Sequence, residues 1–141
     1  MDTSFAQILQ SLGTGLPLLL LHFGATLVLF FVGVAVYVGV TPMHERELLA
    51  SGNRAAGVLL GGTVVALAIP LAATLATSEA LADIVIWGAV ALLLQLLTFL
   101  IAIWLFRDLR PMIEAGNVAA GTALAGLQIA VALLNAGAMA G

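Results

Sequence analysis

Residues 50–57 read Ala-Ser-Gly-Asn-Arg-Ala-Ala-Gly, and residues 114–121 read Glu-Ala-Gly-Asn-Val-Ala-Ala-Gly. The two stretches share Gly-Asn-x-Ala-Ala-Gly and are related by a shift of 64 residues, from 50 to 114. A polar segment precedes each copy, and a long apolar segment follows it. This doubled motif predicts two similar units, in each of which a polar loop leads into a hydrophobic helix.

The composition identifies the class of protein. Of the 141 residues, 63% are hydrophobic and 8% are charged, whereas soluble domains carry about 25% charged residues. The apolar segments have the length of membrane-spanning helices and lack the alternation of membrane β-strands. We therefore expect an all-α integral membrane protein. The absence of cysteine excludes disulfides and thiol chemistry, and a net charge of −3 does not suggest a nucleic-acid partner.

Four membrane spans are predicted, at residues 16–40, 54–77, 84–106 and 118–139. Pro42 stops the first span, and residues 44–50 can form about two turns of surface helix that end at Gly52. The chain then divides into residues 1–15, a first two-span repeat at 16–77 and a second at 78–141, together one membrane domain.

The N-terminal segment, residues 1–15, is too polar to span the membrane. Three polar residues at its start can cap a helix: Asp2, Thr3 and Ser4. Its apolar residues share one helical face: Phe5, Ile8, Leu9 and Leu12. We expect a short amphipathic helix on the membrane surface that ends at Gly13 and Gly15. A disordered tail is the alternative. The first span does not resemble a cleaved signal peptide, because no Lys or Arg precedes it and it is too long.

The arginines predict the orientation. All four lie in or beside the two Gly-Asn loops: Arg46, Arg54, Arg107 and Arg110. Because cytoplasmic loops carry the excess of Lys and Arg, both loops are expected in the cytoplasm. Both termini and the turn at 78–83 are then expected outside.

The repeat predicts how the spans are arranged. Two units of two spans each have the same orientation, which gives a parallel repeat with a pseudo-two-fold axis along the membrane normal. We expect a compact four-helix bundle in which the two hairpins pack side by side. Small residues in the second and fourth spans predict a tight central pair, since they let helices approach closely in lipid. The predicted packing residues are Gly57, Gly61, Gly121, Ala125 and Ala132.

Asn53 and Asn117 each stand at the start of a span. Asparagine is a favoured N-cap, so both are predicted to cap the helix that follows. The alternative is a cytoplasmic anion site formed by the two helix N-termini, with Arg54 and Arg110 nearby.

Polar residues within the spans include six candidates for interhelical bonds or a polar lining: Gln95, Gln128, Asn135, Thr63, Thr74 and Thr98. Gln95 and Gln128 share a depth and are predicted to form an interhelical hydrogen bond. A polar pore lining or a dimer contact is the alternative. Pro70 predicts a kink in the second span, and Asn135 at a similar depth could line a small cavity toward the outer side.

The remaining candidates carry weaker signals. His22 could sense external pH or pair with Glu79 or Asp83, although a packing role is the alternative. His44, Glu45 and Glu47 lack a second histidine at ligand spacing, so no metal site is expected. Trp87 and Trp104, near opposite ends of the third span, are typical interfacial anchors.

Catalytic signals are missing from the sequence. It contains no nucleophile elbow, phosphate-binding loop, zinc motif or pairing of a nucleophile with a base. No charged residue lies well inside a span, which lowers the expectation of an ion-coupled carrier. We expect neither an enzyme nor a bound cofactor.

Extended versions of the doubled motif resemble a known family. The first copy reads Thr41-Pro42…Glu47…Gly52-Asn53-x-Ala55-Ala56, then Gly61-Gly62 and Ile69-Pro70-Leu71. The second reads Ile113-Glu114-x-Gly116-Asn117-Val118-Ala119-Ala120, then Leu133-Leu134-Asn135-Ala136. Over residues 16–140 the chain resembles the domain-of-unknown-function family numbered 350 (DUF350), the YjfL-like bacterial inner-membrane proteins. The resemblance implies a polytopic inner-membrane protein of two-span repeats and no settled activity.

These observations favour a non-catalytic inner-membrane protein that forms a homo-oligomer and supports a membrane complex, with lipid and possible further membrane proteins as partners. The alternative is a channel or conduit for ions or small solutes between protomers, lined by Gln95, Gln128, Asn135 and the threonines. The direction in which these side chains point distinguishes the two hypotheses.

Overall fold

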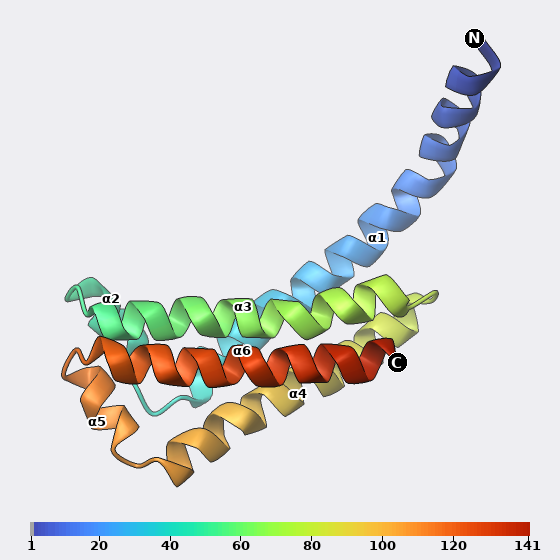
Figure 1. Ribbon diagram of the computed structural model, residues 1–141. Helices are drawn as coiled ribbons and strands as arrows, with labels where there is room; N and C mark the ends of the chain where they lie inside the picture. Colours follow the sequence, from blue (N-terminus) through green and yellow to red (C-terminus); the bar gives the residue numbers. More distant parts are fainter. Residues whose placement is uncertain (1) are drawn as a thin grey trace.

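The computed structural model describes residues 2–141, with side chains described from residue 4 onward. Within this part of the chain every regular element is a helix (Figure 1): α1 Asp2–Val40, α2 Glu45–Ala50, α3 Arg54–Thr77, α4 Leu81–Leu105, α5 Leu109–Glu114 and α6 Val118–Ala140. Helices α1, α3, α4 and α6 are long and apolar enough to cross a membrane. The predicted all-α membrane class with four spans is confirmed.

Helix α1 differs from the prediction. Residues 2–15 are helical as expected, but the predicted end at Gly13 and Gly15 is wrong, because α1 continues through both glycines and Pro17. Each glycine costs a helix only about 1 kcal/mol, and the leucine-rich sequence on either side sustains it. The 39 residues of α1 span about 58 Å, against a hydrocarbon core of about 30 Å. Its N-terminal half extends away from the other helices (Figure 1).

The two Gly-Asn loops have the same backbone geometry. Gly52 and Gly116 adopt positive φ angles of 79° and 88°, a region that favours glycine. Asn53 N–H donates to Leu48 O over 2.9 Å, and Asn117 N–H donates to Met112 O over 2.9 Å. The short helix α2 therefore ends at a glycine in the way the sequence indicates, and α5 ends in the same manner.

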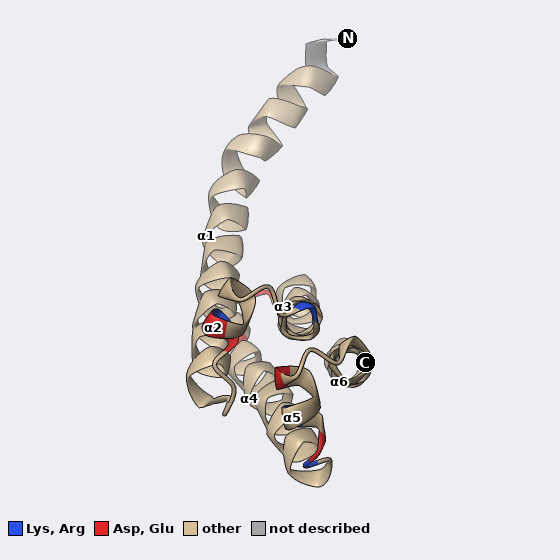
Figure 2. Cartoon of the chain, turned by 90° about the vertical axis from the view of Figure 1, so that its left-hand side faces the viewer, with Lys and Arg blue, Asp and Glu red and all other residues tan. Residues whose placement is uncertain are grey.

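The two hairpins pack side by side. Helix α3 lies along α6, and α1 lies against α4, so each contact joins corresponding, parallel helices of the two hairpins (Figures 1 and 2). Small residues make the α3–α6 contact close. A Cβ added to Gly62 would lie 2.4 Å from the Ala125 Cβ, and one added to Gly121 would lie 2.5 Å from the Ala55 carbonyl oxygen. Glycine is required at both positions.

Only part of the predicted packing set lies in this contact. Gly121, Ala125 and Ala132 are buried. The prediction for Gly61 is wrong within the single chain, because Gly61 is exposed and a Cβ there would meet no atom within 4 Å. Gly57 has only the Leu49 side chain within reach, at 3.7 Å. The reason is the rotation of α3, which turns Gly62 rather than its neighbour Gly61 toward α6.

Candidate functional site

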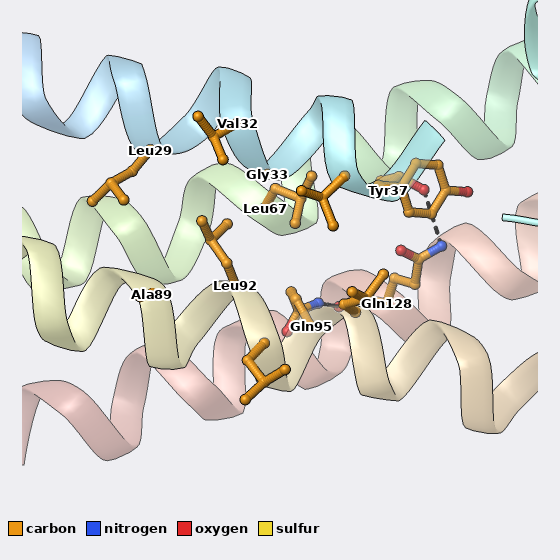
Figure 3. Close-up of a pocket in the computed structure, with 13 residues that line it drawn as sticks. Leu29, Val32, Gly33, Tyr37, Leu67, Ala89, Leu92, Gln95 and Gln128 are labelled. Carbon is orange, nitrogen blue, oxygen red and sulfur yellow. Dashed lines mark hydrogen bonds between the residues drawn. The ribbon is translucent and has the colours of Figure 1, made fainter. Parts of the chain in front are cut away.

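A chain of hydrogen bonds joins three helices in the interior (Figure 3). Gln95 Nε2 of α4 donates to the Gln128 carbonyl oxygen over 2.8 Å, and Gln128 Nε2 of α6 donates to Thr63 Oγ1 of α3 over 3.0 Å. The Thr63 hydroxyl in turn donates a hydrogen bond to the Leu59 carbonyl oxygen over 2.9 Å. Gln95 and Gln128 are each 2% exposed. The structure thus brings the two glutamines together inside one chain.

A cavity of about 250 Å³ lies beside this chain of hydrogen bonds. Its wall is mostly aliphatic, and its polar groups come from Tyr37, Thr63, Gln95 and Gln128 (Figure 3). The Tyr37 ring packs edge-on against Phe99, with ring centroids 4.8 Å apart. The Gln95 Oε1 and Tyr37 hydroxyl oxygens are buried without hydrogen-bond partners.

Glu45 is the residue that sequence reasoning missed. It is the first residue of α2, yet it is only 2% exposed, and neither carboxylate oxygen has a hydrogen-bond partner. The Tyr37 hydroxyl lies close to both the Glu45 carboxylate and the Thr63 hydroxyl. In the structure Thr41, Met43 and Glu45 are all buried between exposed neighbours. A polar loop gave no reason to expect that pattern.

Asn53 and Asn117 occupy the N-cap positions of α3 and α6. Asn53 Oδ1 accepts from Ala56 N–H at 3.0 Å, and Asn117 Oδ1 accepts from Ala120 N–H at 3.2 Å. The two residues differ in their amide groups. Asn53 Nδ2 donates to the carbonyl oxygens of Ile113 at 2.9 Å and Glu114 at 3.1 Å, which joins the two loops. Asn117 forms no such bond in the described residues, and its side chain is exposed.

The other interior polar residues form local or weak bonds. The Thr98 hydroxyl donates to Leu94 O of its own helix at 2.8 Å, and the Thr74 hydroxyl lies 2.9 Å from Pro70 O. Asn135 Nδ2 lies 3.4 Å from the Ala91 carbonyl oxygen of α4.

Asn135 lines a cavity of about 560 Å³ together with Asp83 and Trp87. Pro70 does not line this cavity. Helix α3 is continuous through the buried Pro70, so the proline does not interrupt the span.

His22 of α1 is half-buried. It lines a groove with Leu19 and Phe23 of the same helix and Leu75 of α3. The structure does not bring it to Glu79 or Asp83, since the one ion pair in the described residues joins Arg110 and Glu114 at 2.9 Å.

The four arginines lie at the same end of the molecule (Figure 2): Arg46 on α2, Arg54 at the start of α3, Arg107 just before α5 and Arg110 on α5. Trp87 and Trp104 are exposed near opposite ends of α4. No group of three His, Cys, Asp or Glu residues that could hold a metal ion occurs within the part of the chain that was described.

These features define a small multi-pass helical membrane protein with a hydrogen-bonded polar interior. The family model described as Domain of Unknown Function (DUF350) matches residues 11–139, and the chain belongs to this family. The chain is also similar to the UPF0719 inner membrane protein YjfL of Escherichia coli K12, with 32% identity over 117 residues. The match covers 78% of this chain and 89% of the relative, and YjfL of Escherichia coli O157:H7 matches equally well.

No solved structure matches the chain significantly. The predicted family is confirmed, and the protein is a multi-pass protein of the bacterial inner membrane.

Proposed function

We propose that this chain is a non-catalytic scaffold of the inner membrane, which forms a homo-oligomer by repeating its α3–α6 contact between chains. The supporting observation is that α3 contacts α6 through residues that are not the 64-residue equivalents of those by which α6 contacts α3. Shifting each set of contact residues by 64 positions identifies an exposed set of small residues on the other helix.

The first exposed face lies on α6. Helix α3 packs on α6 through small residues that include Ala55, Gly62 and Ala66. The shift relates these three residues to Ala119, Gly126 and Ala130, which have the same residue types and are all exposed. We call these three residues the free α6 face. A Cβ added to Gly126 would meet no atom within 4 Å of the same chain.

The second exposed face lies on α3. Helix α6 packs on α3 through Gly121, Ala125 and Ala132. Their counterparts are small residues too, and they form what we call the free α3 face: Gly57, Gly61 and Ala68. Gly61 and Ala68 are exposed, and Gly57 is half-buried. The free α6 face of one chain therefore complements the free α3 face of the next. Contacts of this head-to-tail kind close into rings or extend into filaments.

The loops support the same arrangement. Asn53 Nδ2 bonds to the Ile113 and Glu114 carbonyl oxygens, and the shift relates these acceptors to Leu49 and Ala50. In the proposed assembly the exposed Asn117 amide donates to the Leu49 and Ala50 carbonyl oxygens of the neighbouring chain. A bond already seen once within the chain would thus recur at each interface.

Orientation and symmetry form part of the proposal. The arginine-bearing loops lie in the cytoplasm and both termini lie outside, supported by the clustering of all four arginines at one end (Figure 2). The chain is an internal parallel repeat, supported by the matching loop geometry and by the parallel pairing of α1 with α4 and of α3 with α6. The conduit between protomers has less support, because Gln95 and Gln128 are buried and bonded inside one chain.

Cysteine cross-linking tests the proposal in a chain that has no native cysteine. Gly62 meets Ala125 within the chain, so Gly126 is expected to meet Gly61 between chains. Leu127→Cys and Val65→Cys chains, changed at exposed positions beside these glycines, are co-expressed in membranes and treated with a short bismaleimide, and a cross-linked heterodimer is expected. The matched control pairs Leu127→Cys with Leu97→Cys, an exposed position on α4. Equal cross-linking in both pairs would contradict the proposed interface.

A further inference from the structure

The Glu45 carboxylate lacks a counter-charge. Its two oxygens are buried and unbonded, and the only ion pair among the side chains of residues 4–141 joins Arg110 to Glu114. The neighbouring Arg46 is exposed and forms no ion pair. An isolated charge removed from water is strongly unfavourable unless something neutralises it. The fold therefore leaves the Glu45 carboxylate without a neutralising partner among the described residues.

A hydroxyl group lies beside Glu45. The Tyr37 hydroxyl of α1 lies close to the carboxylate and is itself buried without a partner. The Thr63 hydroxyl of α3 is also near the Tyr37 hydroxyl and is held by its bonds to Leu59 O and Gln128 Nε2. Glu45 and Tyr37 thus present three unpartnered oxygens from two elements. Carboxylate and hydroxyl oxygens are the ligands that hard cations prefer.

We propose that Glu45 and Tyr37 bind an alkali metal cation at the loop end of the bundle. A monovalent ion fits the charge, because one carboxylate supplies a single negative charge and divalent sites usually gather more. This proposal is independent of the oligomer, since both residues belong to one chain.

A groove at the loop surface reaches Glu45. It has a volume of about 310 Å³ and is lined by residues of the α1–α2 connection, including Thr41, His44 and Glu45. Water in the groove can complete the coordination of a bound ion. A bound cation would link Glu45 of α2 to Tyr37 of α1 and so hold the first loop on the bundle.

Thermal unfolding of the purified full chain in detergent tests the site. The midpoint is measured in sodium, potassium or N-methylglucamine chloride at equal ionic strength. For the wild type, saturating sodium or potassium is expected to raise the midpoint by several degrees relative to N-methylglucamine. Comparing the two metal salts shows which cation is preferred. An equal midpoint in all three salts would overturn the proposal.

Matched variants locate the effect. Glu45→Gln is expected to abolish the response to metal cations and to unfold at a higher temperature than the wild type in N-methylglucamine. Tyr37→Phe removes one ligand and is expected to raise the half-saturating concentration about tenfold. Glu47→Gln, changed at an exposed neighbour, is expected to keep the wild-type response. A full response in Glu45→Gln would refute the assignment.

Carbodiimide labelling of the wild-type chain keeps the test decisive if the Glu45 variant does not fold. Carbodiimides react with carboxyl groups, and mass spectrometry of peptides reports each site separately. Sodium or potassium is expected to lower labelling at Glu45 several-fold relative to N-methylglucamine while leaving Glu47 unchanged. Labelling of Glu45 that is the same in all salts would show that the carboxyl holds only a proton.

Discussion

The Asn53 side-chain amide donates a 2.9 Å hydrogen bond to the Ile113 carbonyl oxygen, across 60 residues of sequence. The same side chain accepts a bond from Ala56 N–H at the start of α3. One residue therefore caps a helix and fastens the first Gly-Asn loop to the end of α5. Asn117 caps α6 in the same manner, but its amide group points to no acceptor in the described chain. The proposed homo-oligomer uses the Asn53 amide for a contact within the chain and the Asn117 amide for a contact between chains.

Substitution of Asn53 is expected to lower the stability of the single chain, whereas substitution of Asn117 is expected to weaken the oligomer. Asn53→Asp keeps the cap acceptor and loses the amide donor, so the free energy of unfolding is expected to fall by about 1–3 kcal/mol. Asn117→Asp is expected to leave the unfolding of the isolated chain nearly unchanged and to weaken the oligomer. Denaturant unfolding and size-exclusion chromatography in detergent measure the two effects. A stable oligomer in Asn117→Asp would contradict the proposed loop contact.

Neighbouring glycines on α3 are expected to respond in opposite ways. Gly62→Leu introduces atoms where a Cβ alone would lie 2.4 Å from the Ala125 Cβ, so the α3–α6 contact must open. The expected loss is at least the 1–3 kcal/mol that is typical of overpacking. Gly61→Leu enters open space and is expected to preserve the fold of the single chain. Thermal unfolding of both variants checks this, and equal midpoints would show that the close contact does not form.

The interior hydrogen bonds are expected to contribute moderately to stability. Gln128→Leu removes the donor to Thr63 Oγ1, and a loss of about 0.6–2 kcal/mol is expected, the range of interhelical bonds in membranes. Thr98→Val is the control, because the Thr98 hydroxyl bonds only within its own helix. Unfolding measured in detergent compares the two. A larger loss in Thr98→Val would argue against the role of the Gln128 bond.

Cysteine accessibility tests the orientation. Ser51→Cys lies in the first arginine-bearing loop, and Ser78→Cys lies in the turn between α3 and α4. In spheroplasts, a membrane-impermeant maleimide is expected to label Ser78→Cys directly and Ser51→Cys only after lysis. The opposite pattern would show that the loops face outward.

The features that follow from composition and from local motifs could be predicted from the sequence. Apolar length defines four spans, because burial in lipid requires about 20 residues for each helix. The Gly-Asn motifs indicate where α2 and α5 end and where α3 and α6 begin, since positive φ angles and N-caps depend on local chemistry.

Features that depend on tertiary context could not be predicted. Gly13 and Gly15 suggest the end of a first helix, but each weakens a helix by only about 1 kcal/mol, too little to end α1. Gly61 and Gly62 are adjacent small residues, and only the packing of α3 on α6 decides which one faces inward. The burial of Glu45 depends on how the first loop folds onto Tyr37, which no local pattern encodes.

The most direct test of the account is the mass of the assembly. Native mass spectrometry of the wild type, released from detergent, is expected to show a homo-oligomer of defined stoichiometry. Gly126→Ile fills space that is empty within the chain and covers the free α6 face, so it is expected to yield monomers that unfold at the wild-type temperature of the isolated chain. A wild type that is strictly monomeric, or a Gly126→Ile variant with the wild-type stoichiometry, would contradict the account.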